Sequence, residues 1–270
     1  MEHDDLVDAI RRRRAILFVG AGVSKNVGVP TTTEIVNEIA RQLGYDPQEF
    51  QKLADHRTLA EFYQLTKGTL GPLRSWMDVT WHRQDADVRD SQIHKLIVEL
   101  EFPIIYTTNY DRWLERAFEA YGREYIKITN VGDLLKAREG VTQIVKYHGD
   151  FDDDASIILT ETSFFERLDF ESALDLKLQA DVLGRPVLFV GYSMSDINIR
   201  YLVYKLQRLW ESSHLSQLRP KSYVFLGASN PVQERVLRRR GIEPVVSECE
   251  HPGEGLAKFL SDLLDRVSPK

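Results

Sequence analysis

The sequence predicts an α/β protein: a Rossmann-like, doubly wound parallel sheet with a helical insertion. Short apolar segments alternate along the chain with stretches of helical periodicity, and each apolar segment is followed by polar or glycine-rich residues. Nearly continuous apolar strands suit a parallel sheet that is covered on both faces, and repeated strand–helix units suit a doubly wound fold. The expected strands are residues 15–19, 103–106, 144–147, 187–190 and 223–226.

Helical periodicity is clearest in residues 111–121, 196–210 and 231–240. Asp111 and Asp196 stand at the start of the first two stretches, where a short carboxylate side chain caps a helix well.

Two stretches interrupt the alternation. Residues 44–100 contain no convincing strand and indicate several short helices, so we expect a helical insertion over the sheet at about 44–100. In the second stretch, residues 157–159 predict a short strand. With no linker in view, residues 1–270 are expected to form a single domain.

The composition excludes several classes of protein. The chain has 270 residues, a net charge of −6 and one cysteine, Cys249. A single cysteine excludes an internal disulfide and a zinc module with several cysteine ligands, so no zinc is expected. The acidic balance argues against direct nucleic-acid binding. The apolar segments are too short to cross a membrane, and the first residues lack a secretory signal, so we expect a cytoplasmic protein.

Glycine, serine, asparagine, histidine and aspartate follow several of the expected strands. Taken singly, each has an ordinary explanation as a turn or structural residue. Ligands of open α/β sheets bind at the carboxyl ends of the strands. The convergence of these residue types on that edge therefore favours a functional site.

The first strand is followed by Gly20-Ala21-Gly22-Val23-Ser24, and then by Gly28-Val29-Pro30. Glycines here would allow backbone N–H groups to approach a pyrophosphate. No Gly-Lys-Ser/Thr follows, so this is not a Walker A loop. Lys25 occupies the third glycine position of the dinucleotide fingerprint, which makes a conventional NAD dehydrogenase the weakest interpretation.

The second strand leads into Thr107-Thr108-Asn109-Tyr110-Asp111. The amide of Asn109 both donates and accepts, so it can orient a water or a ribose hydroxyl. Asp111 either caps the next helix or contacts a ligand. His148 follows a later strand, where a near-neutral pKa suits a general base. In Gly191-Tyr192-Ser193, small residues would admit a nucleotide, and Ser193 would bond a phosphate.

Taken together and in this order, these motifs resemble the sirtuin superfamily, with patterns G-A-G-x-S, G-[IV]-P, T-x-N-x-D, H-G and G-x-S. The forms N-Y-D at 109–111, H-G-D at 148–150 and G-Y-S-x-x-D at 191–196 are more similar to the bacterial sirtuin-like branch of anti-phage defence systems.

The resemblance implies that NAD⁺ is bound as a substrate. Asn109 and His148 would be catalytic, near the nicotinamide ribose, with Asn109 positioning water and ribose and His148 acting as a general base. The residues expected to contact NAD⁺ are Gly20, Ala21, Gly22, Ser24, Pro30, Thr108, Asp111, Gly191, Tyr192, Ser193, Asp196 and Gly227.

Two departures from the deacylases of that family bear on the reaction. Those enzymes carry a four-cysteine zinc module between H-G and G-x-S, whereas residues 151–190 contain no cysteine. They also continue G-[IV]-P with Asp-Phe-Arg, whereas this chain has Thr31-Thr32-Thr33. The resemblance therefore favours an NAD⁺ glycohydrolase that releases ADP-ribose and nicotinamide as an abortive-infection effector.

Two other functions stay open at this point: an NAD⁺-dependent protein deacylase or ADP-ribosyltransferase, and a non-catalytic module that senses NAD⁺ or ADP-ribose. The resemblance also implies a homo-oligomer, paired with a HerA-type translocase ATPase or another sensor subunit.

Overall fold

One seven-stranded sheet forms the centre of the molecule, with strand order β3-β4-β2-β1-β5-β6-β7. The computed structural model describes residues 3–83, 85–169, 171–192, 194 and 196–268, and for Asn26 the backbone alone. The named strands pair in parallel throughout. They are β1 (Ile16–Val19), β2 (Ile104–Thr107), β3 (Tyr125–Ile128), β4 (Thr142–Lys146), β5 (Val187–Val190), β6 (Ser222–Leu226) and β7 (Ile242–Val246).

The sheet extends to both sides of β1. On one side lie β2, β4 and β3, with β3 at the edge although it precedes β4 in the sequence, and on the other side lie β5, β6 and β7. The prediction of a Rossmann-like, doubly wound parallel sheet is confirmed. In such a sheet the ligand crevice lies at the carboxyl ends of the strands on either side of this switch point, here β1, β2 and β5.

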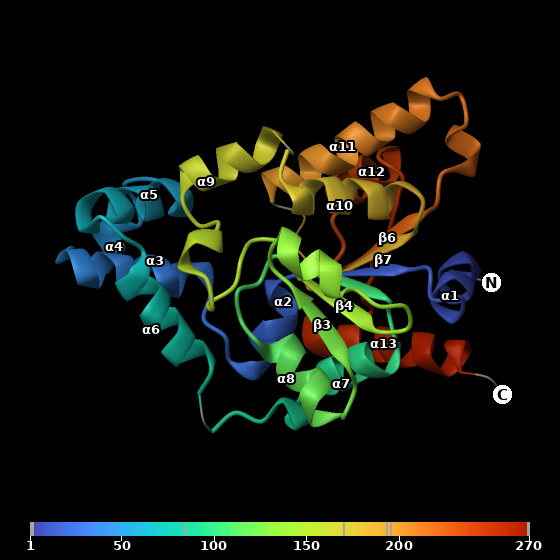
Figure 1. Ribbon diagram of the computed structural model, residues 1–270, viewed down its shortest axis with the longest axis horizontal. Coiled ribbons are helices and arrows are strands. Elements are labelled where there is room, and N and C mark those ends of the chain that lie inside the picture. Colours follow the sequence, from blue (N-terminus) through green and yellow to red (C-terminus); the bar gives the residue numbers. More distant parts are fainter. Residues whose placement is uncertain (1–2, 84, 170, 193, 195, 269–270) are drawn as a thin grey trace.

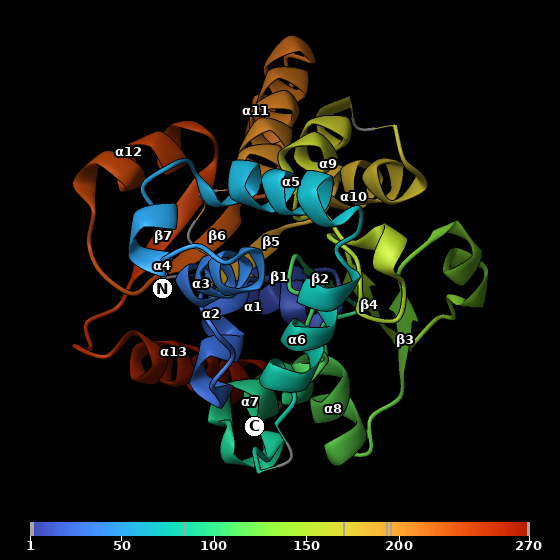
Figure 2. The same ribbon diagram turned by 90° about the vertical axis from the view of Figure 1, so that its left-hand side faces the viewer.

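Helices cover both faces of the sheet (Figure 2). Side chains alternate along each strand, so Leu17 and Val19 pack on one face while Ile16 and Phe18 pack on the other. The first face is covered by α1 (Asp4–Arg11), α7 (Gln92–Glu99), α8 (Trp113–Ala120) and α13 (Pro252–Val267). The second is covered by α10 (Ala173–Leu183), α11 (Ile197–Ser212) and α12 (Pro231–Arg239).

A third hydrophobic cluster lies beyond the carboxyl ends of the strands. It joins α3 (Thr32–Leu43), α4 (Pro47–Phe50), α5 (His56–Lys67) and α6 (Gly71–Trp81) to Phe151, Ile157 and Leu159. Figure 1 shows these helices at one end of the molecule, opposite α1 and both termini. Two short helices, α2 (Ala21–Ser24) and α9 (Glu161–Glu166), complete the set. No helix among the described residues is long and apolar enough to cross a membrane.

The strand predicted at residues 157–159 is wrong. Ile157 and Leu159 are buried, but the segment forms no ladder with a neighbour and belongs to the third cluster. Two strands were not expected from the sequence, β3 and β7. They lie at the two edges of the sheet, where one face is only partly covered, so they lack a continuous apolar run.

Asp196 is the N-cap of α11, as predicted, and Oδ1 accepts hydrogen bonds from the backbone N–H groups of Asn198 and Ile199. At α8 the N-cap position is Arg112 instead of Asp111. Asp111 still supports this helix start, because its Oδ1 accepts a hydrogen bond of 3.1 Å from the backbone N–H of Trp113.

Candidate functional site

The turns after β1 and β5 are packed backbone against backbone. The N–H of Gly20 donates to Val190 O (2.9 Å), and the N–H of Gly22 donates to Gly191 O (2.8 Å). A Cβ on Gly20 would lie 2.5 Å from Gly191 O, and one on Gly191 would lie 2.6 Å from the backbone nitrogen of Val23. These glycines are therefore required by the close approach of the two turns. Their N–H groups donate within the fold, and the pyrophosphate-binding role expected for this loop stays a prediction.

A cavity of about 300 Å³ opens beside these turns. It collects residues that follow β1 and β2 and adds residues from α3 and α6. From the predicted set it is lined by Ala21, Gly22, Pro30, Thr108, Asn109 and Asp111. From outside that set it is lined by Lys25, Val29, Thr31, Thr32, Ile35, Trp81 and Tyr110. The sequence carried no signal that Ile35 and Trp81 would reach this site, because tertiary docking of α3 and α6 brings them there.

Asn109 is held in a rigid turn. Its backbone N–H donates to Thr107 Oγ1 (3.0 Å), and that hydroxyl donates to Val19 O (2.9 Å). The side-chain Nδ2 donates to Ser24 Oγ (3.0 Å). This bond fixes the orientation of the amide, and the carbonyl oxygen Oδ1 has no protein donor in the part of the chain that is described. The turns after β1 and β2 are thus in direct contact through Ser24 and Asn109.

His148 follows β4 and is buried, with 3% of its surface exposed. Its Nε2 lies 3.4 Å from Asp196 Oδ2, and the ring of Phe164 stands edge-on to it at 5.3 Å. Burial lowers the pKa of His148 to about 4, although the negative charge of Asp196 acts in the opposite direction. The imidazole is therefore neutral at neutral pH, which is the form that accepts a proton.

Tyr192 adds a second buried polar group near Asp196. Burial raises the pKa of its hydroxyl well above the ordinary value, and the charge of Asp196 raises it further. Among the described residues, neither the Tyr192 hydroxyl nor the Nε2 of His148 has a hydrogen-bond partner of good geometry. Both groups are thus buried polar atoms whose hydrogen-bonding capacity the described residues leave unused.

A buried network of charges joins the β2 and β4 turns. The ammonium group of Lys146 is fully buried and donates to the backbone carbonyl of Asp111. Its Nζ also lies 3.3 Å from Glu115 Oε1 and 3.8 Å from Asp150 Oδ2. Burial raises the pKa of Glu115. The network fixes Asp111, two residues after Asn109, relative to Lys146, two residues before His148.

Not every predicted residue belongs to this constellation. Gly227 follows β6, and a Cβ there would lie 2.7 Å from Pro252 Cβ, so packing against α13 explains the glycine. It does not line the cavity. His148 and Asp196 also lie outside its lining. Ser193 lies outside the described residues. The functional assignments of the whole set remain predictions.

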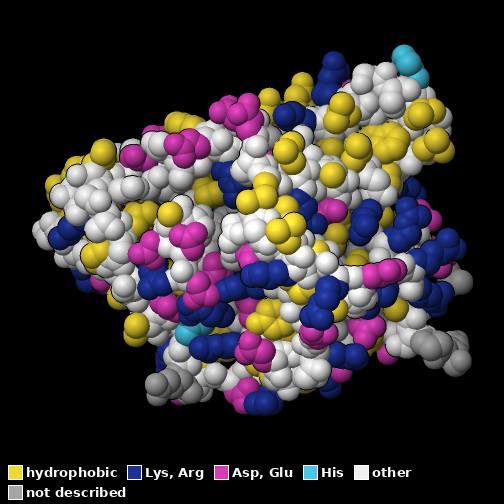
Figure 3. All heavy atoms as spheres, viewed as in Figure 1, with side chains coloured by type: hydrophobic (Ala, Val, Ile, Leu, Met, Phe, Trp, Pro, Cys, Tyr) yellow, Lys and Arg dark blue, Asp and Glu magenta, His cyan; other side chains and the backbone are white. Residues whose placement is uncertain are grey.

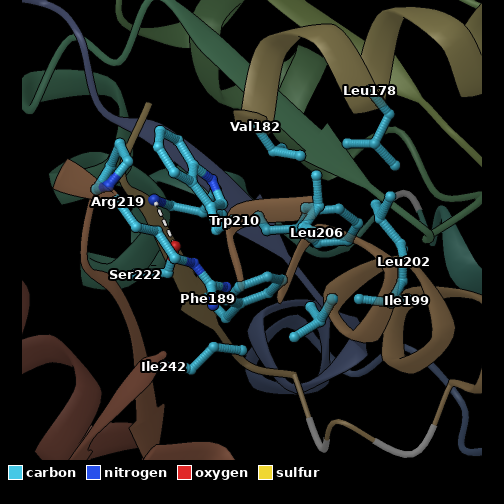
Figure 4. A pocket seen from close by; sticks show the side chains of 14 residues that line it. Leu178, Val182, Phe189, Ile199, Leu202, Leu206, Trp210, Arg219, Ser222 and Ile242 are labelled. Carbon is cyan, nitrogen blue, oxygen red and sulfur yellow. Dashed lines mark hydrogen bonds between the residues drawn. The ribbon is translucent and has the colours of Figure 1, made fainter. Parts of the chain in front are cut away.

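A second cavity has unsuitable chemistry for a polar substrate. It lies between the sheet and α10 and α11, encloses about 30 Å³, and is lined mainly by apolar side chains such as Phe189, Leu202 and Leu206 (Figure 4). This volume is close to that of a single water. Of these two, the cavity beside Asn109 is the better candidate for ligand binding. Among the described residues, no group of three or more His, Cys, Asp or Glu side chains is arranged to hold a metal ion.

A search of solved structures finds the same fold in a protein described as a Sir2 homologue in complex with NAD. The match covers 99% of this chain and 96% of that one, with a TM-score of 0.50 and 13% sequence identity. At this identity the match establishes the fold alone.

Several characterised proteins are similar in sequence. The NAD(+) hydrolase ThsA of Enterococcus faecium is 30% identical over 200 residues, which cover 73% of this chain and 40% of that protein. ThsA of Bacillus cereus (strain MSX-D12) is 27% identical, covering 77% and 43% of the two chains. Defense-associated sirtuin 2 of Bacillus subtilis is 22% identical, covering 77% and 21%. The chain thus spans less than half the length of these relatives.

Residues 103–245 match the family model of the SIR2-like domain. The matched segment begins just before β2 and ends within β7, so it contains the Asn109, His148 and Tyr192 turns. The sequence motifs, the sheet topology and this match lead to one conclusion: the chain belongs to the SIR2-like domain family.

Proposed function

We propose that this chain binds NAD⁺ and hydrolyses it to ADP-ribose and nicotinamide, as the effector of an anti-phage defence system. The observation that carries the proposal is the placement of Asn109 and His148, both buried, at the carboxyl ends of the adjacent strands β2 and β4. Two relatives of similar sequence are named NAD(+) hydrolase ThsA, which supports the same reaction.

Hydrolysis of the nicotinamide–ribose bond requires few catalytic groups. Cleavage of the nicotinamide–ribose bond passes through an oxocarbenium-like state, as in glycoside hydrolysis. Nicotinamide leaves as a neutral molecule from a cationic ring, so its departure requires no general acid. The site must supply a positioned water, and a group that takes a proton from that water or from a ribose hydroxyl.

Asn109 and His148 suit these two tasks. With Nδ2 committed to Ser24, Asn109 presents Oδ1 as an acceptor for a water or a ribose hydroxyl. His148 is neutral at working pH and stands next to a carboxylate. When the imidazole takes a proton, Asp196 stabilises the resulting positive charge.

The wider setting belongs to the same proposal. We place the protein in the cytoplasm, treat residues 1–270 as one SIR2-like unit with a helical insertion at about 44–100, and expect a homo-oligomer with a HerA-type translocase ATPase or another sensor as partner. Exposed apolar side chains gather over α11 and the turn that follows it (Figure 3). They include Tyr204, Leu209, Leu215 and Leu218, which are 46 to 65% exposed. Such a patch favours self-association or a partner.

The test is nicotinamide release from NAD⁺ by the purified chain, alone and together with the product of the neighbouring gene. Parallel reactions with an acetylated peptide, analysed by mass spectrometry, distinguish hydrolysis from deacylation or ADP-ribosylation. We expect free ADP-ribose and nicotinamide in equal amounts, and no change in the mass of the peptide. Nicotinamide release that depends on the peptide would contradict the proposal.

A further inference from the structure

We propose that Trp81, at the end of α6, is a binding residue for the pyridinium end of the dinucleotide, so that the helical insertion completes the ligand site. The inference rests on the proposed function, because it takes NAD⁺ as the ligand. Trp81 lies about thirty residues before the Asn109 turn in the sequence, yet lines the same cavity and is 5% exposed.

The end of α6 is firmly attached to that turn. The backbone carbonyl of Trp81 accepts a hydrogen bond of 3.1 Å from Trp113 Nε1. The backbone N–H of Arg112 donates to His82 Nε2 (2.8 Å), and Arg112 Nη1 lies 2.6 Å from Asp78 Oδ1. Three separate contacts therefore hold the last turn of α6 against residues 112–113. Trp81 is consequently a fixed wall of the cavity instead of a mobile cover.

Neighbouring rings fix the indole itself. Its centroid lies 6.2 Å from that of Tyr110, with 24° between the ring planes. Phe151 stands edge-on to it at 5.5 Å. Tyr110 is held in turn by its hydroxyl, which donates to Ile158 O (2.5 Å). An aromatic wall that is already ordered loses little conformational entropy when a ligand binds.

The lining of the cavity indicates what it holds. Val29, Pro30 and Ile35 are apolar, and Trp81 and Tyr110 are aromatic. The charged side chains are the carboxylate of Asp111 and the ammonium group of Lys25. Flat rings pack well on aromatic surface, and a positive charge is attracted both by aromatic rings and by a carboxylate. The pyridinium ring of NAD⁺ is flat and positively charged, whereas its adenine is neutral. A volume of about 300 Å³ is also small for a ligand pocket, which suits one end of a dinucleotide.

The experiment compares two probes that hydrolysis does not consume: 1-methylnicotinamide, which keeps the positive charge of the pyridinium ring, and ADP-ribose. Binding of 1-methylnicotinamide is followed by ligand-detected NMR and binding of ADP-ribose by calorimetry, both on the full chain. The variants are Trp81→Ala and Trp81→Phe, which keeps a flat ring but has no N–H. The matched control is Trp76→Ala, because Trp76 lies on the same helix, is partly buried in the third cluster and does not line the cavity. A thermal melt checks that each variant is folded.

We expect Trp81→Ala to weaken 1-methylnicotinamide binding about tenfold and Trp81→Phe to weaken it less, with ADP-ribose binding within twofold of wild type in both. Trp76→Ala should change neither. Equal loss of both ligands, unchanged 1-methylnicotinamide binding in both Trp81 variants, or a wild-type chain that binds ADP-ribose but not 1-methylnicotinamide would overturn the inference and leave the proposed function standing. A wild-type chain that binds neither probe would contradict the proposed function itself.

Discussion

The side chain of Asp196 has two partners, one on each oxygen. Oδ1 caps α11 by accepting from the backbone N–H of Asn198 (2.8 Å), and Oδ2 lies 3.4 Å from His148 Nε2. One carboxylate thus ties the start of α11 to the histidine that follows β4. Asp196 was expected from the sequence to contact NAD⁺, and this geometry gives it a second possible task, the orientation of His148.

Asp196→Asn tests this relationship. Asparagine caps helices about as well as aspartate, so α11 should persist, but the negative charge beside His148 is lost. We expect kcat for NAD⁺ hydrolysis to fall about tenfold or more, because the imidazolium formed in the reaction loses its stabilising charge. KM should stay within twofold. Steady-state kinetics measures both, and Asp46→Asn, at the N-cap of α4, is the matched control. A large rise in KM with unchanged kcat would instead assign Asp196 to nucleotide binding.

The buried state of His148 predicts how stability depends on pH. The pKa of His148 is lowered from 6.5 to about 4. Burial is the largest cause, Arg167 and Arg57 act in the same direction, and Asp196 and Asp175 act against it. Between these two values the unfolded chain binds a proton at this position and the folded chain does not. Stability should therefore be lost as the pH falls from about 6.5 towards 4, by about 1.4 kcal/mol per pH unit for one such site. His94, whose pKa is also lowered by burial to about 4, adds an effect of the same sign.

Urea denaturation at pH 7, 6 and 5 measures this dependence. His148→Gln should reduce the slope by about 1.4 kcal/mol per pH unit below pH 6, while His214→Gln, at an exposed position, should leave it unchanged. An unaltered slope in His148→Gln would show that His148 is not buried as described.

Lys146→Met should destabilise the fold strongly. Methionine fills a similar volume but leaves Glu115 and Asp150 buried without the ammonium group. Breaking a buried ion pair from one side costs about 3–5 kcal/mol, and the double variant Lys146→Met with Glu115→Gln should recover part of it. Lys136→Met, which removes an exposed lysine from its pair with Asp133, should cost less than about 1 kcal/mol. Equal urea midpoints for the two single variants would contradict the network.

Gly191→Ala isolates the contact between the β1 and β5 turns. Gly191 has φ +60°, and its Cβ would lie 2.6 Å from Val23 N, whereas Gly44 has φ +79° and open space around a Cβ. Alanine in the left-handed region costs about 1–2 kcal/mol at either site. At Gly191 the clash should add about 1–3 kcal/mol more, and ADP-ribose binding should weaken because Gly22 is displaced. Urea denaturation measures the loss of stability, and calorimetry measures ADP-ribose binding. Equal losses of stability and of binding in Gly191→Ala and Gly44→Ala would contradict the two expectations.

The sequence predicted the centre of the sheet well because central parallel strands are buried on both faces. Residues 187–190 are uniformly apolar and form β5 as expected. The edge strands β3 and β7 were not predicted, because edge strands are less completely buried and therefore lack a uniformly apolar sequence. Tyr125–Ile128 alternates between half-buried and buried positions, and Ile242–Val246 contains Pro244, which an edge strand tolerates.

The site was predictable only in part. The strand-end residues Asn109 and Thr108 could be found because topology brings the carboxyl ends of parallel strands together. Trp81 could not, since its position depends on the docking of α6 against Arg112. The sequence motif drew attention to Gly20 and Gly22, but the close approach of Gly191, which requires a residue without a Cβ there, is a contact between distant segments that the sequence does not show.

The most direct test of the central claim is nicotinamide release from NAD⁺ under conditions in which the wild-type chain is active. Asn109→Ala and His148→Ala should each reduce kcat at least a hundredfold while the variants stay folded and still bind ADP-ribose. Nicotinamide release by both variants at near wild-type rates would contradict the proposed catalytic roles, because the reaction would then not depend on the two residues that follow β2 and β4.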